Sequence, residues 1–342
     1  MTRTRKQFDE SVEPDFFNSV TSLEDLLERA KLPKYQNSHI LNAASLIQES
    51  FKPMQWAVRD FLPEGCVLFA GRPKLGKSWF AYQIALAIAS GGMALGQIPV
   101  KQGDVLYLAL EDGRQRLQWR LQALLKDGQA PQSLHLAMEW PALDEGGLDD
   151  LEDWLERYSS TARLIIIDTF QRVRPASSGD SVYAIDFNSL RRLTDLTREF
   201  PVCIMVVHHT RKASAEDAFD TMSGSTGLTG AVDALLVLKR SRGRADAEMH
   251  ITGRDIEETA KALRFDKETM LWHLLGEASE VWQSADRAAI RTLLKGSETG
   301  MRSAEIADYL GKRPNSVRQT LSRMLRDGQV SLLDRGLYGV RS

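Results

Sequence analysis

The sequence predicts an α/β fold whose mainly parallel sheet is covered by helices on both faces. Apolar strand-like runs alternate with helical patterns between residues 66 and 209, as in parallel strands joined by crossover helices. The run RLIIIDT holds too few apolar positions for a helix and predicts a buried strand. The chain has 342 residues, of which 43% are hydrophobic and 26% charged. This globular composition leaves room for one large domain and smaller ones.

The N-terminal part, residues 1–52, is predicted to be a helical arm. Residues 1–19 are polar and charged, and two helical patterns follow between Ser22 and Ser50. A segment with two prolines and a glycine, KPMQWAVRDFLPEG, is interpreted as a linker that ends the arm. The apolar positions of the two patterns are Leu23, Leu26, Leu27 and Ala30, and then Ile40, Leu41, Ala44, Leu46 and Ile47.

Residues 53–278 are predicted to form the α/β domain. After residue 230 the strand-like segments follow one another with little room for helices, so the sheet is expected to finish with antiparallel strands. The expected strands lie at 66–71, 104–111, 134–137, 163–169, 202–209, 234–240, 249–255 and 262–275. The expected helices lie at 78–91, near 114–125, at 148–158 and at 186–200.

A different composition begins after Ala285, and residues 284–342 are predicted to form a separate small domain. Helices are expected at 286–295, 303–310 and 315–328, followed by a hairpin around Asp334, Arg335 and Gly336. Three helices and a hairpin in this order resemble a winged helix. The last 57 residues hold eleven Lys and Arg but only six Asp and Glu, although the whole chain has a net charge of −2. The tail is therefore a candidate for contact with DNA.

The two cysteines and the absence of long apolar runs indicate a cytoplasmic protein. Cys66 and Cys203 lie within strand-like runs and are interpreted as reduced core thiols. No apolar run reaches the length of about 18 residues that a membrane span needs. The polar N-terminal segment has no signal-peptide pattern.

A phosphate-binding loop is predicted at residues 71–78, which fit the pattern G-x-x-x-x-G-K-[ST] between a strand and a helix. The glycines let backbone N–H groups point at phosphate oxygens, and the helix N-terminus favours the same anion. Lys77 is expected to reach the β- and γ-phosphates of a nucleotide, and Ser78 to hold Mg²⁺. The nucleotide-binding residues are thus Gly71, Arg72, Pro73, Lys74, Leu75, Gly76, Lys77, Ser78 and Trp79.

Carboxylates at two other strand ends extend this site. Asp168 ends the strand LIIID, where a carboxylate would support Mg²⁺. Glu111 and Asp112 end the run VLYLALED, where one of them would polarise the attacking water as general base. The residues alone leave this choice open.

A histidine pair ends the strand VCIMVVHH and can sense the γ-phosphate. By strand alternation, only one of His208 and His209 faces the phosphate side. The expected role is a hydrogen bond to the γ-phosphate that reports its loss to the following loop. We favour His209 and keep His208 as the alternative.

The segments GRPKLGKSWFAYQIALAIASG, LYLALED, LIIIDT and VVHHTRK, in this order, resemble a RecA-like ATPase core, and more closely the plasmid RepA-type hexameric replicative helicases. The similarity covers roughly residues 53–260 and extends to relatives in phages and mobile elements. It implies ATP with Mg²⁺ bound between subunits of a homo-oligomeric ring, a hexamer. It favours Glu111 as catalytic glutamate and His209 as phosphate sensor. It also implies an arginine finger from the neighbouring subunit, for which we favour Arg254 over Lys239 or Arg240.

The same resemblance implies that two loops grip single-stranded DNA. They lie at 171–182 and 210–230, and cationic side chains suit contact with the phosphate backbone. Acidic residues in the second loop, Glu216, Asp217 and Asp220, weaken a purely electrostatic interpretation. In the tail, the helix at 315–328 lies where a recognition helix would enter duplex DNA. The candidate DNA-binding residues are Arg172, Arg174, Arg211, Lys212, Arg318, Arg323 and Arg335.

The sequence therefore favours an ATP-dependent replicative DNA helicase of a plasmid, phage or mobile element. The alternative is a non-motor ATPase that uses ATP to switch assembly, as a replication regulator or loader that binds DNA. A small-molecule kinase is disfavoured, because the sequence offers no acceptor pocket. A primase or an initiator protein is the expected protein partner of the helicase.

Overall fold

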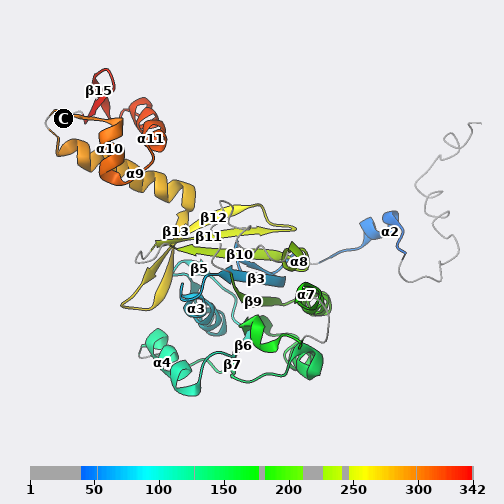
Figure 1. The fold of residues 1–342 in the computed structure, drawn as a ribbon. Coiled ribbons are helices and arrows are strands. Elements are labelled where there is room, and N and C mark those ends of the chain that lie inside the picture. Colours follow the sequence, from blue (N-terminus) through cyan, green and yellow to red (C-terminus); the bar gives the residue numbers. More distant parts are fainter. Residues whose placement is uncertain are drawn as a thin grey trace, which may run out of the picture. The chain divides into compact units, whose positions relative to one another are not determined.

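The computed structural model describes residues 40–51, 53–126, 128–176, 182–210, 226–240, 246–297 and 299–340. Within them, a nine-stranded sheet in the order β13-β12-β11-β10-β3-β9-β8-β6-β7 forms the centre of the fold (Figure 1). The predicted α/β architecture is confirmed. The parallel strands are β3 Gly65–Gly71, β6 Asp104–Ala109, β7 Leu134–Ala137, β8 Ala162–Asp168, β9 Cys203–His209 and β10 Ala234–Arg240.

One end of the sheet continues with antiparallel strands, as predicted. They are β11 Asp246–Gly253, β12 Thr259–Asp266 and β13 Leu271–Glu277. β10 joins the two parts, because it pairs in parallel with β3 and antiparallel with β11.

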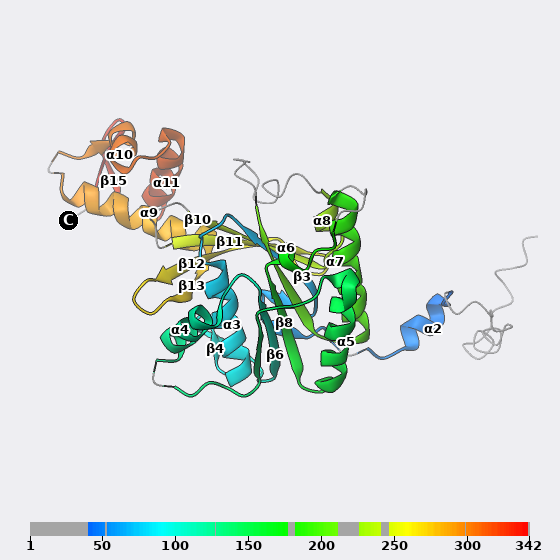
Figure 2. The same ribbon diagram turned by 60° about the horizontal axis from the view of Figure 1, so that its bottom comes forward.

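Helices cover the two faces of the sheet (Figure 2). The helices α3 Lys77–Ser90 and α4 Arg114–Leu125 lie on one face, where Phe80 and Ile84 share a core with Val67 and Phe69. On the other face, α5 Leu148–Arg157 and α7 Val182–Glu199 pack against the opposite side chains of the strands. Three short helical segments escaped the sequence prediction: η1 Leu143–Gly147, α6 Phe170–Val173 and α8 Thr226–Gly230.

The carboxyl ends of the parallel strands meet at one edge of the sheet. Gly71 at the end of β3 pairs with His209 at the end of β9, and Asp168 at the end of β8 pairs with Val207. Residues separated by more than a hundred positions are thus brought to a common edge, where ligands of open α/β sheets bind.

The interpretation of residues 52–65 as a linker is wrong for most of the segment. β1 Trp56–Val58 and β2 Leu62–Pro63 form an antiparallel hairpin, and Val58, Phe61 and Leu62 are buried in the main core. The prolines and the glycine therefore mark a tight hairpin, and the apolar residues between them anchor it. A second small hairpin, β4 Met93–Ala94 with β5 Ile98–Pro99, was also not predicted.

Cys66 and Cys203 are free, buried thiols, as predicted. Burial raises the pKa of Cys66 to about 12 and that of Cys203 well above its usual value. None of the described helices has the length and apolar character needed to cross a membrane.

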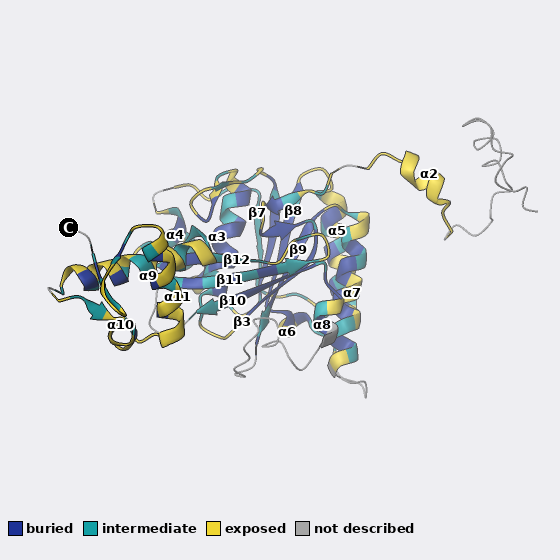
Figure 3. Ribbon diagram, turned by 90° about the horizontal axis from the view of Figure 1, so that it is seen from above, coloured by how far each residue is buried: buried dark blue, intermediate teal, exposed yellow. Residues whose placement is uncertain are grey.

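The C-terminal segment contains the predicted helices and hairpin. A small core forms around Ile290, Leu294, Val317, Leu321 and Met324, and strongly polar faces surround it (Figure 3). The elements are α9 Ala278–Lys295, β14 Met301–Arg302, α10 Ser303–Leu310, α11 Pro314–Arg326, β15 Ser331–Asp334 and β16 Leu337–Gly339. No observation on the described residues tests the winged-helix assignment, which stays a prediction.

The helix α9 runs across the boundary predicted between residues 278 and 284. It starts directly after β13, and Gly276 precedes the junction with a φ of 128°. Ala278 at the start of α9 is buried, and α9 contacts β12 and β13. Ile290 and Leu294, further along the helix, belong to the small C-terminal core.

By their contacts, the residues divide into two units, 1–53 and 54–342. In the first, α2 spans Ala43–Gln48, and the side chain of Asn42 caps it by accepting a hydrogen bond from the N–H of Ala44 at 2.8 Å. The second predicted helix is thus confirmed over part of its length, and the first, around residues 23–30, lies outside the described residues. The apolar side chains of α2 and its flanks are exposed: Ile40, Leu41, Leu46, Ile47 and Phe51.

Candidate nucleotide-binding site

The loop between β3 and α3 has the conformation of an anion cradle. Gly76 adopts a φ of 99°, a left-handed conformation that favours glycine. A Cβ atom on Gly76 would lie 3.1 Å from Cζ2 of Trp272, and the Trp272 indole N–H donates to the carbonyl oxygen of Gly76 at 3.1 Å. The backbone of the loop is therefore held from the β12–β13 side.

The start of α3 offers unpaired donors to this cradle. The N–H of Phe80 makes the first helical hydrogen bond, to the carbonyl oxygen of Gly76 at 3.0 Å. The N–H groups of Lys77, Ser78 and Trp79 precede this bond, so they belong to the donors that a helix leaves without an intrahelical partner. Such a helix start binds phosphate.

Lys77 lies within the loop with 4% of its surface exposed. Its Nζ donates to the carbonyl oxygens of Gly71 at 2.7 Å and Arg72 at 3.1 Å, and lies 2.9 Å from Nδ1 of His209. Burial lowers the pKa of Lys77 to about 8, although the nearby Asp168 and Glu111 carboxylates act in the opposite direction. An added polyanion would favour the charged ammonium group.

Asp168 is buried at the end of β8 and lies beside the loop. Burial raises its pKa, and hydrogen bonds from the side chains of Ser78 and Tyr107 oppose this shift; the Tyr107 hydroxyl donates at 3.0 Å. A carboxylate next to a hydroxyl is an oxygen donor set that fits Mg²⁺. No cluster of three or more metal-ligating side chains occurs among the described residues. That agrees with Mg²⁺, which often binds one or two protein groups together with substrate phosphates.

The neighbouring carboxylates Glu111 and Asp112 face different partners. Glu111 accepts a hydrogen bond from the Thr169 hydroxyl at 3.0 Å, and its Oε2 lies 3.8 Å from Nε2 of His209. Asp112 instead forms ion pairs with Arg116, at 3.2 Å, and with Arg120. Glu111 is thus the carboxylate next to the loop, and Asp112 fastens the start of α4.

The two histidines at the end of β9 also differ. His209 lies between Lys77 and Glu111, and its side chain is 38% exposed. His208 packs against the ring of Phe170, with ring centroids 6.5 Å apart, and burial lowers its pKa to about 4. Burial also lowers the pKa of His209, followed by the charge of Lys77. The structure therefore brings His209 together with Lys77, Glu111 and Asp168.

The three candidates for an arginine finger lie at opposite edges of the sheet. Arg254 follows β11 at the edge away from the loop, where it contacts the carbonyl oxygen of Gly230 at 3.2 Å and Asp233 at 3.8 Å. Lys239 and Arg240 end β10 at the edge of the loop. Arg240 donates to the carbonyl oxygen of Leu75 at 3.3 Å. The structure does not bring Arg254 together with the other candidate site residues of the same chain.

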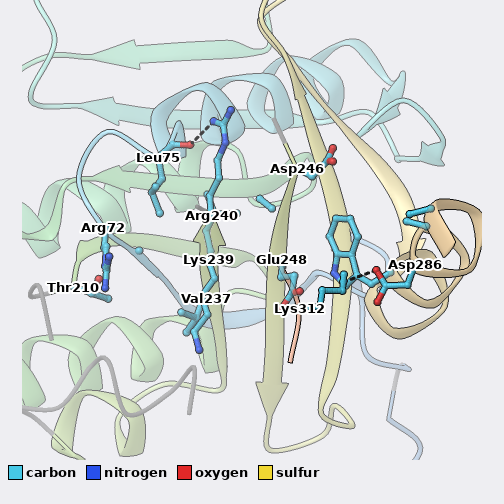
Figure 4. Close-up of a pocket in the computed structure, with 16 residues that line it drawn as sticks. Arg72, Leu75, Thr210, Val237, Lys239, Arg240, Asp246, Glu248, Asp286 and Lys312 are labelled. Carbon is cyan, nitrogen blue, oxygen red and sulfur yellow. Dashed lines mark hydrogen bonds and ion pairs between the residues drawn. The ribbon is translucent and has the colours of Figure 1, made fainter. Parts of the chain in front are cut away.

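A cavity of about 830 Å³ adjoins the loop on the β10–β11 side (Figure 4). Arg72, Leu75 and Thr210 form its loop side, and charged side chains of both signs form the opposite walls. Trp282 of α9 also lines it. The charged lining residues are Arg72, Lys239, Arg240, Asp246, Glu248, Asp286 and Lys312.

The candidate DNA-binding residues have varied surroundings. Arg172 is exposed on α6, whereas Arg174 forms an ion pair with Asp186 of α7 at 2.6 Å and has a side chain only 16% exposed. Arg211 and Lys212 lie outside the described residues. In the tail, Val317, Leu321 and Met324 of α11 are buried, as its apolar spacing predicts. Arg318 and Arg323 of α11, and Arg335 between β15 and β16, are exposed.

Sequence reasoning missed three residues that shape the site: Tyr107, Thr169 and Trp272. Tyr107 and Thr169 lie within or next to the expected strands, so their positions were available but their partners were not. Trp272 lies 196 positions from Gly76, and no local pattern encodes that contact.

Comparison with known proteins supports the same fold. Residues 32–215, more than half of the chain, match a family model described as an AAA domain. The solved ATPase domain of a phage replicative helicase matches with a TM-score of 0.51 and 17% identity, over 62% of this chain and 85% of that one. A DnaB-like replicative helicase, whose structure addresses its interactions with primase, matches with a TM-score of 0.52 and 16% identity, over 73% of this chain and 70% of that one. No curated protein matches the chain.

Proposed function

Because the chain belongs to the AAA domain family, we propose that it is an ATP-dependent replicative DNA helicase that works as a ring on single-stranded DNA. The observation that carries the proposal is the meeting of Lys77, Asp168, Glu111 and His209 at one phosphate-binding loop. The similarity of the fold to the phage ATPase domain and to a DnaB-like replicative helicase supports the step from ATPase to helicase.

In this proposal, each residue of the cluster has one role in ATP hydrolysis. The N–H groups of the loop and the ammonium group of Lys77 hold the β- and γ-phosphates. Ser78 and Asp168 hold Mg²⁺, which when bound neutralises phosphate charge. Glu111 accepts a proton from the attacking water, and Thr169 orients its carboxylate. His209 contacts the γ-phosphate and links its presence to the segment that follows β9.

Assembly into a ring supplies the remaining charge. We propose a homo-hexamer with ATP at each subunit interface and an arginine finger from the neighbour. Arg254 is exposed at the edge of the sheet remote from its own loop, so it is available to another subunit. Arg240 is the alternative, although its contact with Leu75 ties it to its own loop.

Single-stranded DNA would be held by segments that follow β8 and β9, since these strands end next to the nucleotide. Arg172, Arg211 and Lys212 are the proposed phosphate contacts. Arg174 was part of the same prediction, but its ion pair with Asp186 makes it a support for α7. A primase or an initiator is the proposed protein partner.

A second function is favoured by the C-terminal segment. Arg318 and Arg323 are exposed on α11, and Arg335 is exposed at the tip of the hairpin. This basic surface suits duplex DNA and would serve a non-motor ATPase, a replication regulator or loader, as well as a helicase. Strand displacement separates the two functions.

The test measures ATP hydrolysis and strand displacement on a forked duplex by the full chain. The helicase is expected to hydrolyse ATP faster when single-stranded DNA is added and to separate the fork. Lys77→Ala should abolish both activities and leave the unfolding temperature nearly unchanged. A protein that hydrolyses ATP but never separates the strands would favour the non-motor alternative.

A further inference from the structure

We propose that Trp79 and Trp119 form a stacking platform for the base of the bound nucleotide, and that this platform gives the site a preference for purines. The inference rests on the proposed ATP-hydrolysing function and extends it from the phosphates to the nucleoside. Trp119 was not singled out by its sequence, and its role follows from where the fold places it.

The two indoles lie side by side next to the phosphate-binding loop. Their ring centroids are 5.6 Å apart at an interplanar angle of 72°. Trp119 projects from α4 and is 53% exposed, although a tryptophan is usually well covered in a folded protein. A large aromatic face is therefore open to solvent beside the site.

The surroundings hold Trp79 in place. The guanidinium group of Arg120 lies over the Trp79 ring, 5.4 Å from its centroid, and the same arginine is paired with Asp112. The Tyr82 hydroxyl donates to the carbonyl oxygen of Leu117 at 3.4 Å, which joins α3 to α4 a turn further on. Trp119 thus rests on an ordered ring and loses little conformational freedom when a ligand stacks on it.

The platform lies within reach of a nucleotide held by the loop. Trp79 supplies one of the N–H groups at the start of α3 that precede the first helical hydrogen bond. Its backbone therefore faces the phosphates, and its side chain stands at the flank of the helix start. A nucleoside attached to those phosphates and directed to this flank meets the open face of Trp119.

The other flank of the loop suits a base less well. The cavity there is lined by cationic and anionic side chains, which match polar groups better than an uncharged purine ring. Trp272, the nearest large ring on that side, is fully buried, and Arg240 already lies over it at 5.3 Å. Trp282 lines the same cavity and provides a matched comparison.

The experiment measures equilibrium binding by calorimetry with Mg²⁺ and three ligands: a non-hydrolysable ATP analogue, the CTP analogue and tripolyphosphate. Base–aromatic stacking implies that Trp119→Ala weakens the ATP analogue by roughly 5- to 150-fold. Tripolyphosphate has no base, so its affinity should stay within about twofold. Trp119→Phe is expected to restore most of the affinity, and Trp282→Ala to match the unaltered protein. The unaltered protein should bind the ATP analogue more tightly than the CTP analogue.

Three results would overturn the platform while leaving the proposed function intact. In the first, Trp119→Ala keeps its full affinity for the ATP analogue. In the second, it weakens tripolyphosphate to the same extent, and in the third, Trp282→Ala is the variant that loses the base. In each, the unaltered protein still binds tripolyphosphate. Failure of the unaltered protein to bind any of the three ligands would instead remove the proposed function.

Discussion

Glu111 and Asp112 are neighbours in the chain, and their different partners predict different effects of substitution. Glu111→Gln keeps the shape of the side chain but removes the base, so ATP should still bind while turnover falls by roughly 10²- to 10⁴-fold. Asp112→Asn breaks the ion pairs with Arg116 and Arg120, so it should lower the free energy of unfolding and spare turnover by the folded protein. Steady-state hydrolysis and urea unfolding of the two variants check this. Full turnover in Glu111→Gln would transfer the role to Asp112.

The lowered pKa of Lys77 predicts that nucleotide binding takes up a proton in alkaline solution. With a pKa of about 8, the empty site holds mainly neutral lysine at about pH 9, and phosphates favour the charged form. At about pH 6.5 Lys77 already carries its proton, so it takes up none there. Calorimetry in buffers of different ionisation enthalpy counts the protons.

His209, Asp168 and Glu111 face the same ammonium group and need a control. His209 has a lowered pKa and is neutral at about pH 9, so His209→Asn should leave the alkaline uptake in place. No proton uptake by the unaltered protein at about pH 9 would contradict the assignment to Lys77.

At the scale of elements, the loop depends on the hairpin β12–β13 behind it. Gly76→Ala places a methyl group against Trp272 in a left-handed backbone conformation, and is expected to cost about 1–3 kcal/mol of stability and to abolish ATP binding. Gly311 also has a positive φ, of 61°, but nothing lies within 4 Å of its would-be Cβ. Gly311→Ala should therefore lose similar stability and keep ATP binding. Thermal unfolding and calorimetry separate the two effects.

Local pattern predicted the elements that carry the site. The strands β3, β8 and β9 are short apolar runs, and the glycines of the loop lie between a strand and a helix, so their positions follow from the sequence. The hairpin β1–β2 was taken for a linker, because turn residues are also frequent in linkers. The choice between Glu111 and Asp112 depends on α4, and the support of Gly76 depends on Trp272; neither contact has a signature in local sequence.

At the scale of the molecule, the charge of the C-terminal segment predicts a salt-dependent interaction with duplex DNA. Removing one phosphate contact lowers the slope of log affinity against log salt by about 0.9, so the double variant Arg318→Gln, Arg323→Gln should reduce it by about 1.8. Arg198→Gln, which removes an exposed arginine from α7, is the control and should leave the slope unchanged. Binding to a labelled duplex at several salt concentrations measures both. An unchanged slope in the double variant would exclude α11 from the DNA contact.

The continuous passage from β13 into α9 has a consequence for limited proteolysis. β13 ends at Glu277 and α9 starts at Ala278, so a protease finds no loop between them to cut. Ala278 is buried at the start of this helix, and Ile290 and Leu294 complete the small core at its other end. Any cleavage between the two cores must therefore unravel an edge strand or a shared helix, and neither fragment retains all of the surface on which it folded.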